Sequence, residues 1–251
     1  LEEDTATDGA SVAFHGPLKK GANTRRAGED VAEGAPLLDA GRVLTPADLA
    51  LLSATGVARV TVREPLRVAV LSTGDELTEG CPAPGQIADA NRPMLRAVLA
   101  RWGLEVIDLG IAPDDAGQIA VRLSDGAARA DAILTSGGAS AGDEDHVSRL
   151  LTGTGSFALW RIALKPGRPL ALGLWEGKPV FGLPGNPVAA LVCTLVFGRP
   201  ALSVLAGSGW VEPQGYVVPA AFAKSKKPGR REFLRARIRD GRAEVFASEG
   251  S

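Results

Sequence analysis

Four short segments of the sequence combine glycine with hydroxyl or carboxyl side chains, and each follows an apolar run. They are STGDEL (72–77), APDD (112–115), TSGGASAGDEDH (135–146) and GLPGNP (182–187). Glycines without bulk let backbone N–H groups approach phosphate oxygens, and a helix that follows such a loop attracts anions at its N-terminus. The carboxylates of Glu76, Asp114 and Asp145 are hard oxygen ligands, which suit Mg²⁺ beside a phosphate. Lys165 and Arg168 add positive charge for an oxyanion. These segments therefore predict a site for a phosphate-containing ligand, a divalent cation and a second anion.

Each feature by itself also has a simpler interpretation. A pair of glycines is usually only a turn, and Asp114 with Asp115 is typical of a helix N-cap. The acidic run at 143–145 is also typical of a helix start, and Asp75 with Glu76 fits a solvated turn. The functional interpretation is favoured because four segments of compatible chemistry follow four apolar runs.

Apolar runs alternate with helical periods between residues 66 and 206, and this alternation indicates how the four segments are positioned. Strands are predicted at 66–73, 104–111 and 130–138, helices at 91–102, 114–129, near 143–151 and over 187–205, and extended segments at 157–164, 169–175 and 178–183. Runs such as VAVL (68–71) lack polar alternation, which is typical of strands buried on both faces of a parallel sheet. The sequence therefore predicts a doubly wound α/β domain, in which ligands bind beyond the carboxyl ends of the strands.

Regions of different composition flank this domain, so three domains are predicted at 1–64, 65–207 and 208–251. The first is polar and rich in glycine, with a short helix expected from Thr45 as N-cap to Gly56 and a strand at 57–62. The last shows short alternating segments at 216–223, 232–238 and 243–247. The expected fold class is therefore α/β, with a doubly wound domain between a mixed β-rich N-terminal region and a small, incomplete C-terminal β domain.

The charge of the chain is unevenly distributed. The 251 residues are 45% hydrophobic and 23% charged with a net charge of −1, yet the stretch 224–242 holds nine lysines and arginines against Glu232 and Asp240. Such a stretch is compatible with a nucleic-acid surface. The alternation of apolar and basic residues in FLRARI (233–238) and the shortage of aromatic residues instead favour a solvated strand face or a small anionic ligand. We therefore expect no nucleic-acid partner.

Other classes of protein are disfavoured by what the sequence contains. There is no uncharged apolar run of 18 residues, so we expect no membrane span, and no signal-peptide pattern opens the chain. Cys81 and Cys193 are too few for a disulfide framework, which predicts a reducing, cytoplasmic location. Two histidines without a CxxC or HExxH motif argue against zinc. Because the chain begins with Leu1 and its one methionine is Met94, we expect it to lack its natural start.

The order of these motifs resembles the molybdopterin molybdenumtransferase family, of the MoeA and gephyrin E-domain type. The motifs that carry the resemblance are NTRRAGEDV (23–31), STGDEL (72–77), GQIADAN (85–91), TSGGASAGDED (135–145), KPGRP (165–169), GLPGNP (182–187) and KKPGRREFLRAR (226–237). The resemblance covers nearly the whole chain. It implies a molybdopterin-binding α/β domain and a role in molybdenum cofactor biosynthesis, in which molybdate is inserted into adenylylated molybdopterin and AMP is released with the help of Mg²⁺.

The resemblance also implies roles for individual residues. The catalytic set would be Asp30, Glu76, Asp114, Asp145 and Lys165, with Glu76 and Asp145 as metal ligands. The substrates, molybdopterin-adenylate and molybdate, would contact Ser72, Thr73, Gly74, Asp75, Ser136, Gly137, Gly138, Ser140, Arg161, Pro184, Gly185, Asn186, Pro187, Arg235 and Ser251. Lys165, Arg161 and Arg235 would supply the cationic donors for MoO₄²⁻.

The sequence departs from the family pattern at two positions, and the resemblance implies two partners. Arg161 stands where lysine is common, and Ala189 stands where many relatives carry serine. The family implies a homodimer whose site forms between subunits, and a partner enzyme that supplies the adenylylated substrate. Two alternatives remain open, a non-catalytic molybdopterin-binding or scaffold module of the same fold and, less favoured, a hydrolase with a related domain.

Overall fold

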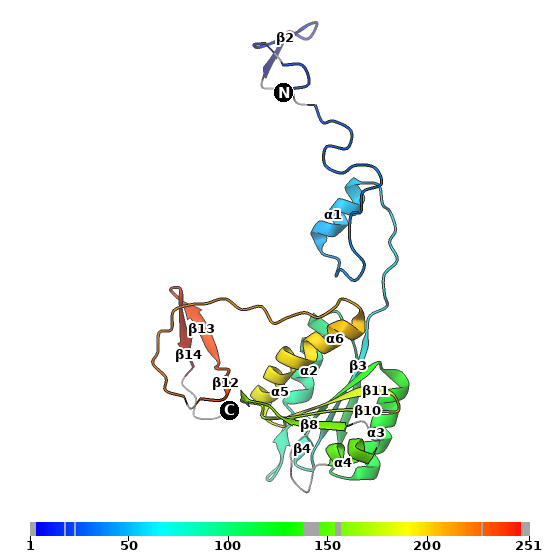
Figure 1. Ribbon diagram of the computed structural model, residues 1–251, viewed down its shortest axis with the longest axis vertical. Coiled ribbons are helices and arrows are strands. Elements are labelled where there is room, and N and C mark those ends of the chain that lie inside the picture. Colours follow the sequence, from blue (N-terminus) through cyan, green and yellow to red (C-terminus); the bar gives the residue numbers. More distant parts are fainter. Residues whose placement is uncertain are drawn as a thin grey trace. The chain divides into compact units, whose positions relative to one another are not determined.

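The computed structural model describes residues 4–17, 19–22, 24–137, 146–153, 157–226 and 228–246, and it contains two compact units, Leu1–Thr61 and Val62–Ser251 (Figure 1). In the first unit, β1 (Thr5–Thr7) and β2 (Val12–Phe14) form an antiparallel hairpin. Helix α1 (Pro46–Ala54) begins as expected, because Thr45 and Asp48 form a capping box and Arg42 pairs with Asp48 at 2.9 Å.

The strand predicted at 57–62 is wrong. This segment runs in extended form without a strand assignment, and Val60 and Val62 are exposed. Alternation of apolar and polar residues stabilises a strand only where a neighbouring strand offers its backbone groups, and no described segment pairs with this one.

The second unit is built on a six-stranded sheet in the order β6-β3-β7-β11-β10-β8. Its strands are β3 (Arg67–Thr73), β6 (Glu105–Ala112), β7 (Ala132–Ser136), β8 (Phe157–Arg161), β10 (Pro169–Trp175) and β11 (Lys178–Leu183). Strands β6, β3, β7 and β11 run parallel, whereas β10 pairs antiparallel with both of its neighbours, β11 and the edge strand β8. The antiparallel edge arises because β10 and β11 are joined by a tight turn through Glu176 and Gly177, too short for a crossover.

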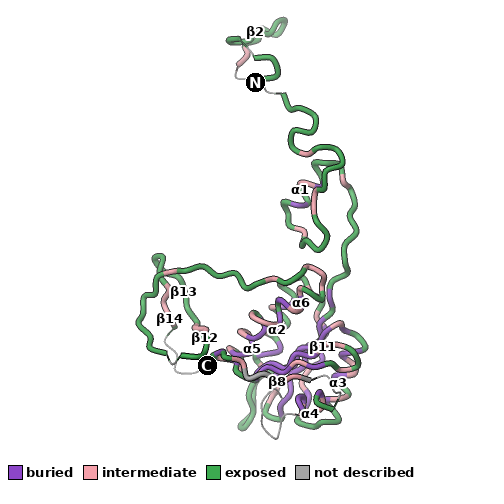
Figure 2. Tube along the Cα trace, in the orientation of Figure 1, coloured by how far each residue is buried: buried purple, intermediate pink, exposed green. Residues whose placement is uncertain are grey.

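Helices cover both faces of the sheet, which confirms the expected doubly wound fold. They are α2 (Asn91–Arg101), α3 (Ala116–Arg129), α4 (His146–Gly153) and a continuous helical stretch made of α5 (Pro187–Cys193), the π-helical η2 (Thr194–Gly198) and α6 (Arg199–Ala206). Leu95 and Leu99 of α2 share one core with Leu202 of α6, whereas Ile119 and Leu123 of α3 share a second core with residues of α4. Alternate residues of the sheet belong to the two cores, with Val68 and Val70 in the first and Ala69 and Leu71 in the second, and the strands of the sheet are mostly buried (Figure 2).

The stretch Pro187–Ala206 is long and apolar enough to cross a membrane, by length and composition alone. Its buried residues Ala190, Cys193 and Leu202 nevertheless belong to the core that α2 shares with the sheet. Burial raises the pKa of the Cys193 thiol to about 11. We therefore assign this stretch as a core helix of the α/β domain.

The chain beyond α6 forms short strands that belong to two separate two-stranded sheets and not to the six-stranded sheet. Strand β12 (Arg231–Glu232) pairs in parallel with β9 (Leu164–Lys165), and β13 (Ala236–Arg239) forms a hairpin with β14 (Arg242–Val245). The strand predicted at 216–223 is wrong, since this segment is largely exposed and contributes one bridge, Ala220 to Ala243. The proposed boundary at 208 stays a prediction, because the compact unit runs from Val62 to Ser251.

Gly126 determines how closely α3 approaches the sheet. A Cβ at this position would lie 2.9 Å from Leu109 Cδ1, 3.2 Å from Ile133 Cδ1 and 3.4 Å from Ala69 Cβ. Gly126→Ala is therefore expected to lower the free energy of unfolding by about 1–3 kcal/mol, because three core side chains must move. Gly198→Ala is the matched control, since its Cβ would be 3.6 Å from the nearest atom. Urea unfolding measures both variants, and equal stability of the two would contradict the prediction.

Candidate functional site

Three parallel strands, β3, β7 and β11, end at the same edge of the sheet. In their register Ser72 lies opposite Ser136, and Ser136 lies opposite Leu183. The loops that follow these strands, and the loop after β6, are the four segments that the sequence singled out. Two of them are linked directly, since Gly74 N donates a 3.1 Å hydrogen bond to Ala112 O.

Polar atoms are buried at this edge without partners. Among the described residues, Ser72 Oγ, Thr73 Oγ1, Thr135 Oγ1 and Asn91 Oδ1 are buried and accept or donate no hydrogen bond. Leaving such a group unsatisfied costs about 1–3 kcal/mol, so buried polar atoms normally pair with protein, water or ligand. Because alternate residues of a strand face opposite sides of the sheet, the hydroxyl groups of Ser72 and Thr73 lie on opposite faces. The edge is therefore chemically suited to hold a polar ligand.

Gly137 lets the ends of β3 and β7 approach closely. Its φ is +93°, and a Cβ there would lie 2.5 Å from Thr73 O. Its backbone N donates to Leu183 O at 3.3 Å, which ties the end of β7 to the end of β11. Only glycine fits this position without moving the backbone of Thr73.

The acidic residues of two loops lie together. Asp114 N donates to Asp75 Oδ1 at 3.0 Å, and Asp75 N donates to Asp114 Oδ2 at 3.4 Å. Asp115, rather than Asp114, caps α3 by accepting from Gln118 N at 2.8 Å. The Glu76 carboxylate lies against Gly74, where a Cβ would be 2.8 Å from Glu76 Oε2. Asp75, Glu76 and Asp114 are exposed, so their carboxylates are accessible to a ligand or cation.

The GLPGNP loop leads into α5. Asn186 caps this helix by accepting from Ala189 N at 3.1 Å, and Pro187 occupies its first turn. Pro184 is buried, whereas Gly185 is exposed and its carbonyl accepts from Asn91 Nδ2 at 2.7 Å.

The carboxylate of Glu232, in the C-terminal segment, forms ion pairs with two lysines. Glu232 Oε1 lies 3.0 Å from Lys224 Nζ and 3.2 Å from Lys165 Nζ. The hydrogen bond from Lys224, reinforced by that from Lys165, lowers the pKa of the Glu232 carboxyl. The parallel pairing of β12 with β9 brings Glu232 beside Lys165. Arg235 follows this strand and its carbonyl accepts from Phe246 N at 3.0 Å.

The described part of the second unit does not contain all of the predicted site residues. Gly138, Ser140, Asp145 and Ser251, and the side chain of Arg161, lie outside the described residues. Asp30 belongs to the first unit, where it is exposed and pairs with Arg25 at 2.8 Å.

The sequence interpretation missed Thr135, Glu232 and Lys224, and it gave Asn91 no role. Asn91 was nevertheless part of the GQIADAN motif (85–91) and stood at the start of a predicted helix, and Glu232 was the acidic residue within the basic stretch. Neither signal pointed to its partners, because these lie far away in sequence.

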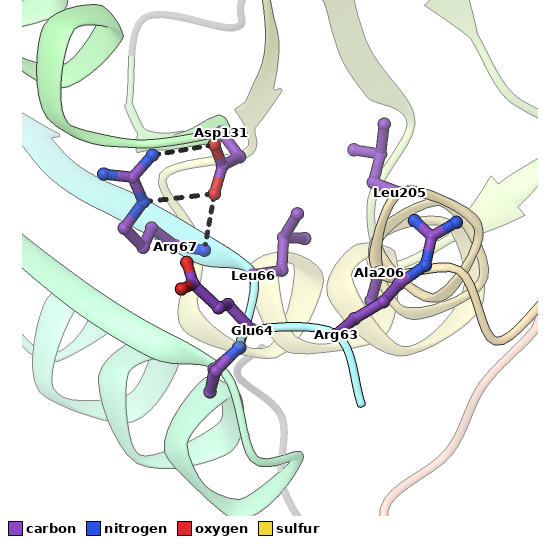
Figure 3. Close-up of a pocket in the computed structure, with 8 residues that line it drawn as sticks. Arg63, Glu64, Leu66, Arg67, Asp131, Leu205 and Ala206 are labelled. Carbon is purple, nitrogen blue, oxygen red and sulfur yellow. Dashed lines mark hydrogen bonds and ion pairs between the residues drawn. The ribbon is translucent and has the colours of Figure 1, made fainter. Parts of the chain in front are cut away.

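The opposite edge of the sheet carries a cavity of about 360 Å³ (Figure 3). Its lining includes Arg67 and Asp131, which pair with each other through three hydrogen bonds of 3.0–3.3 Å. The hydrogen bonds from Arg67 lower the pKa of Asp131. Since ligands of open parallel sheets bind at the carboxyl ends of the strands, we do not assign this cavity as the functional site.

The fold and the polar edge define a molybdopterin-binding α/β domain, as comparison with known proteins shows. A family model described as "Probable molybdopterin binding domain" matches residues 69–204, and one described as "MoeA N-terminal region (domain I and II)" matches residues 1–56. The chain belongs to the MoeA-type molybdopterin molybdenumtransferase family.

Individual relatives agree with this assignment. The chain is 39% identical to the molybdopterin molybdenumtransferase of Haemophilus influenzae over 93% of its length and 40% identical to molybdopterin molybdenumtransferase 2 of Mycobacterium tuberculosis over 98%. A crystal structure of the molybdopterin biosynthesis moeA protein of Pyrococcus horikoshii matches all of this chain and 62% of its own, with a TM-score of 0.78 and 26% identity. The chain spans 59–63% of the length of the two curated relatives.

Gly137→Ala is expected to be more destabilising than the same change at Gly177. Both glycines have positive φ, but a Cβ at Gly177 would meet nothing within 4 Å, whereas one at Gly137 would meet Thr73 O. The backbone strain is therefore shared, and the contact adds about 1–3 kcal/mol to the cost at Gly137. Urea unfolding of the two variants measures the difference. A loss at Gly137 no larger than that at Gly177 would show that the strand ends can separate freely.

The ion pairs of Glu232 predict a dependence of stability on pH. Because the pKa of this carboxyl in the folded state lies below its ordinary value of 4.5, the unfolded chain binds the proton more readily. Its stabilising contribution is present above about pH 4.5 and is lost as the pH falls through the folded-state value. Glu232→Gln should therefore lose less stability than the unchanged protein between about pH 5 and about pH 3 in urea unfolding. Glu212→Gln, at an exposed glutamate without an ion pair among the described residues, should follow the unchanged protein.

Proposed function

We propose that the complete protein is a molybdopterin molybdenumtransferase, which inserts molybdate into adenylylated molybdopterin and releases AMP in molybdenum cofactor biosynthesis. The observation that carries this proposal is the set of buried, unsatisfied polar atoms where β3 and β7 end, beside loops of the expected chemistry. The names of the curated relatives support the same activity.

The loops at the sheet edge would bind the pterin nucleotide. Ser72, Thr73 and Ser136 offer hydroxyl groups, while Gly74 and Gly137 keep the backbone accessible. The neighbouring N-terminus of α5 favours negative charge, as phosphate groups carry. The other residues assigned to this ligand are Asp75, Gly138, Ser140, Pro184, Gly185, Asn186 and Pro187.

Cationic side chains would bind molybdate. Lys165 is 64% exposed along its side chain, so its ammonium group is accessible to an oxyanion although it pairs with Glu232. Arg161 and Arg235 complete the proposed molybdate contacts, and Ser251 would contact the substrates from the last domain. Fixed positive charge of this kind stabilises the dianion and the phosphate oxygens released when the phosphoanhydride is cleaved by water.

The carboxylate oxygens at this edge are the kind of donor that a divalent cation such as Mg²⁺ binds. The described residues contain no cluster of three His, Cys, Asp or Glu side chains able to hold a metal ion. Mg²⁺ usually takes one or two carboxylates and keeps several waters, so the exposed Glu76 together with Asp145 would suffice. When bound, the ion would neutralise charge on the phosphoanhydride oxygens. Asp114, tied to Asp75 by backbone hydrogen bonds, would keep the neighbouring acidic loop in position.

Asp30 and the partners complete the proposal. Asp30 would contribute to the catalytic set from the first unit, in a homodimer whose subunits share the site. A second enzyme would supply the adenylylated molybdopterin. A cytoplasmic location fits these partners and the buried, free Cys193.

The activity can be tested on the full-length protein with adenylylated molybdopterin, molybdate and Mg²⁺. We expect AMP release that requires molybdate and falls at least about 100-fold in Asp145→Asn. Lys165→Met should raise the KM for molybdate about 10-fold or more, because one charged contact to the dianion is lost. Lys178→Met is the matched control, since Lys178 lies near Asp131 at 3.9 Å, at the opposite edge of the sheet. Tight molybdopterin binding without molybdate-dependent AMP release would instead indicate a non-catalytic binding module.

A further inference from the structure

Asn91, the first residue of α2, connects two of the loops at the sheet edge. Its Nδ2 lies 2.6 Å from Ser136 Oγ and 2.7 Å from Gly185 O. Ser136 ends β7 and Gly185 lies in the GLPGNP loop, so one amide group links segments 45 and 94 residues away from it in sequence. Asn91 is 6% exposed, which makes it one of the few polar side chains buried in this unit.

The orientation of the amide follows from its partners. The Gly185 carbonyl can only accept a hydrogen bond, so Nδ2 and not Oδ1 must face it. Ser136 Oγ accepts the second amide hydrogen, which uses the full donor capacity of Asn91. Oδ1 is then left buried without a partner among the described residues, and it can only accept.

The backbone around Asn91 is held rigidly. Asp89 Oδ1 accepts from the backbone N of both Asn91 and Arg92, at 3.1 Å each. The Arg92 guanidinium pairs with Asp89 at 3.2 Å, with both carboxylate oxygens of Asp108 at 2.7 Å, and with Glu79. Side-chain and backbone contacts together therefore hold Oδ1 in a fixed position before any ligand binds.

We propose that Asn91 is a ligand-contacting and positioning residue, whose Oδ1 accepts a hydrogen bond from an N–H group of the bound pterin while Nδ2 holds the two loops in place. An amide oxygen has no hydrogen to offer to phosphate or molybdate, whereas a pterin ring carries N–H donors. The inference rests on the proposed function. It adds that Asn91 Oδ1 recognises the pterin ring, whereas other groups bind the anions.

The first test compares Asn91→Leu with Thr194→Val in the full-length protein. Leucine matches asparagine in size but has no polar atom, and Thr194→Val removes another buried hydrogen bond, from Thr194 Oγ1 to Ala190 O at 2.7 Å, within the core helix. We expect Asn91→Leu to weaken molybdopterin binding at least about 10-fold more than AMP binding, because both ligands lose the positioning of the loops by Nδ2 but only the pterin loses a hydrogen bond to Oδ1. Thr194→Val should bind both probes within about twofold of the unchanged protein, even where its Tm falls equally.

The outcomes separate the inference from the function on which it rests. Equal weakening of molybdopterin and AMP by Asn91→Leu, or binding of molybdopterin within about twofold of the control, would overturn the role of Oδ1. Failure of the unchanged full-length protein to bind molybdopterin would instead overturn the proposed function.

A second variant keeps the inference testable if leucine disturbs folding. Asn91→Asp retains an acceptor oxygen but loses both donors and places an oxygen against Gly185 O. It should therefore have a lower Tm than Asn91→Leu and yet bind molybdopterin more tightly. A purely structural role for Asn91 predicts the reverse, with affinity following stability, and that result would overturn the proposal.

Discussion

The parallel pairing of β3, β7 and β11 is the constraint on which the rest of the structure depends. Parallel strands end at the same edge of a sheet, so this pairing brings together Ser72, Ser136 and Leu183, which lie where three of the candidate segments begin. The crossovers that parallel strands require place α2 and α3 on opposite faces, where each covers its own apolar core. The polar groups of the candidate site are thus concentrated by backbone hydrogen bonds that involve none of the candidate side chains.

Close approach at this edge is then maintained by a few specific contacts. Gly137 allows the backbone of β7 to turn against Thr73 O, and Asn91 ties Ser136 to the GLPGNP loop. The ion pairs of Arg92 with Asp89 and Asp108 hold the start of α2, on which Asn91 depends. Together these contacts fix the loop positions before ligand binding, which reduces the conformational entropy that a ligand must overcome.

Sequence patterns predicted the strands and helices of the α/β domain well, and they predicted the segments on either side of it less well. The strands of the sheet were recognisable because burial on both faces requires continuous apolar runs, and the start of α3 because the pair Asp114 and Asp115 is typical of a helix N-cap. The strands expected at 57–62 and 216–223 are absent, since alternation does not create a pairing partner. The candidate site was predicted as a set of loops, but Glu232 and Lys224 were missed because their ion pairs join segments that are separate in the sequence. Thr135 was missed because the burial of its unpaired hydroxyl is decided by packing.

The sequence by itself determined the fold class, the family and the types of chemical group at the site, because periodicity, capping residues and glycine-rich motifs are local properties of the chain. The tertiary structure decided which of these groups meet. It paired Asp75 with Asp114 and left Asp115 to cap a helix, it placed Glu232 between two lysines, and it buried Asn91 Oδ1 without a partner among the described residues. Such contacts depend on register and on the packing of helices against the sheet, and neither is encoded in any single stretch of sequence.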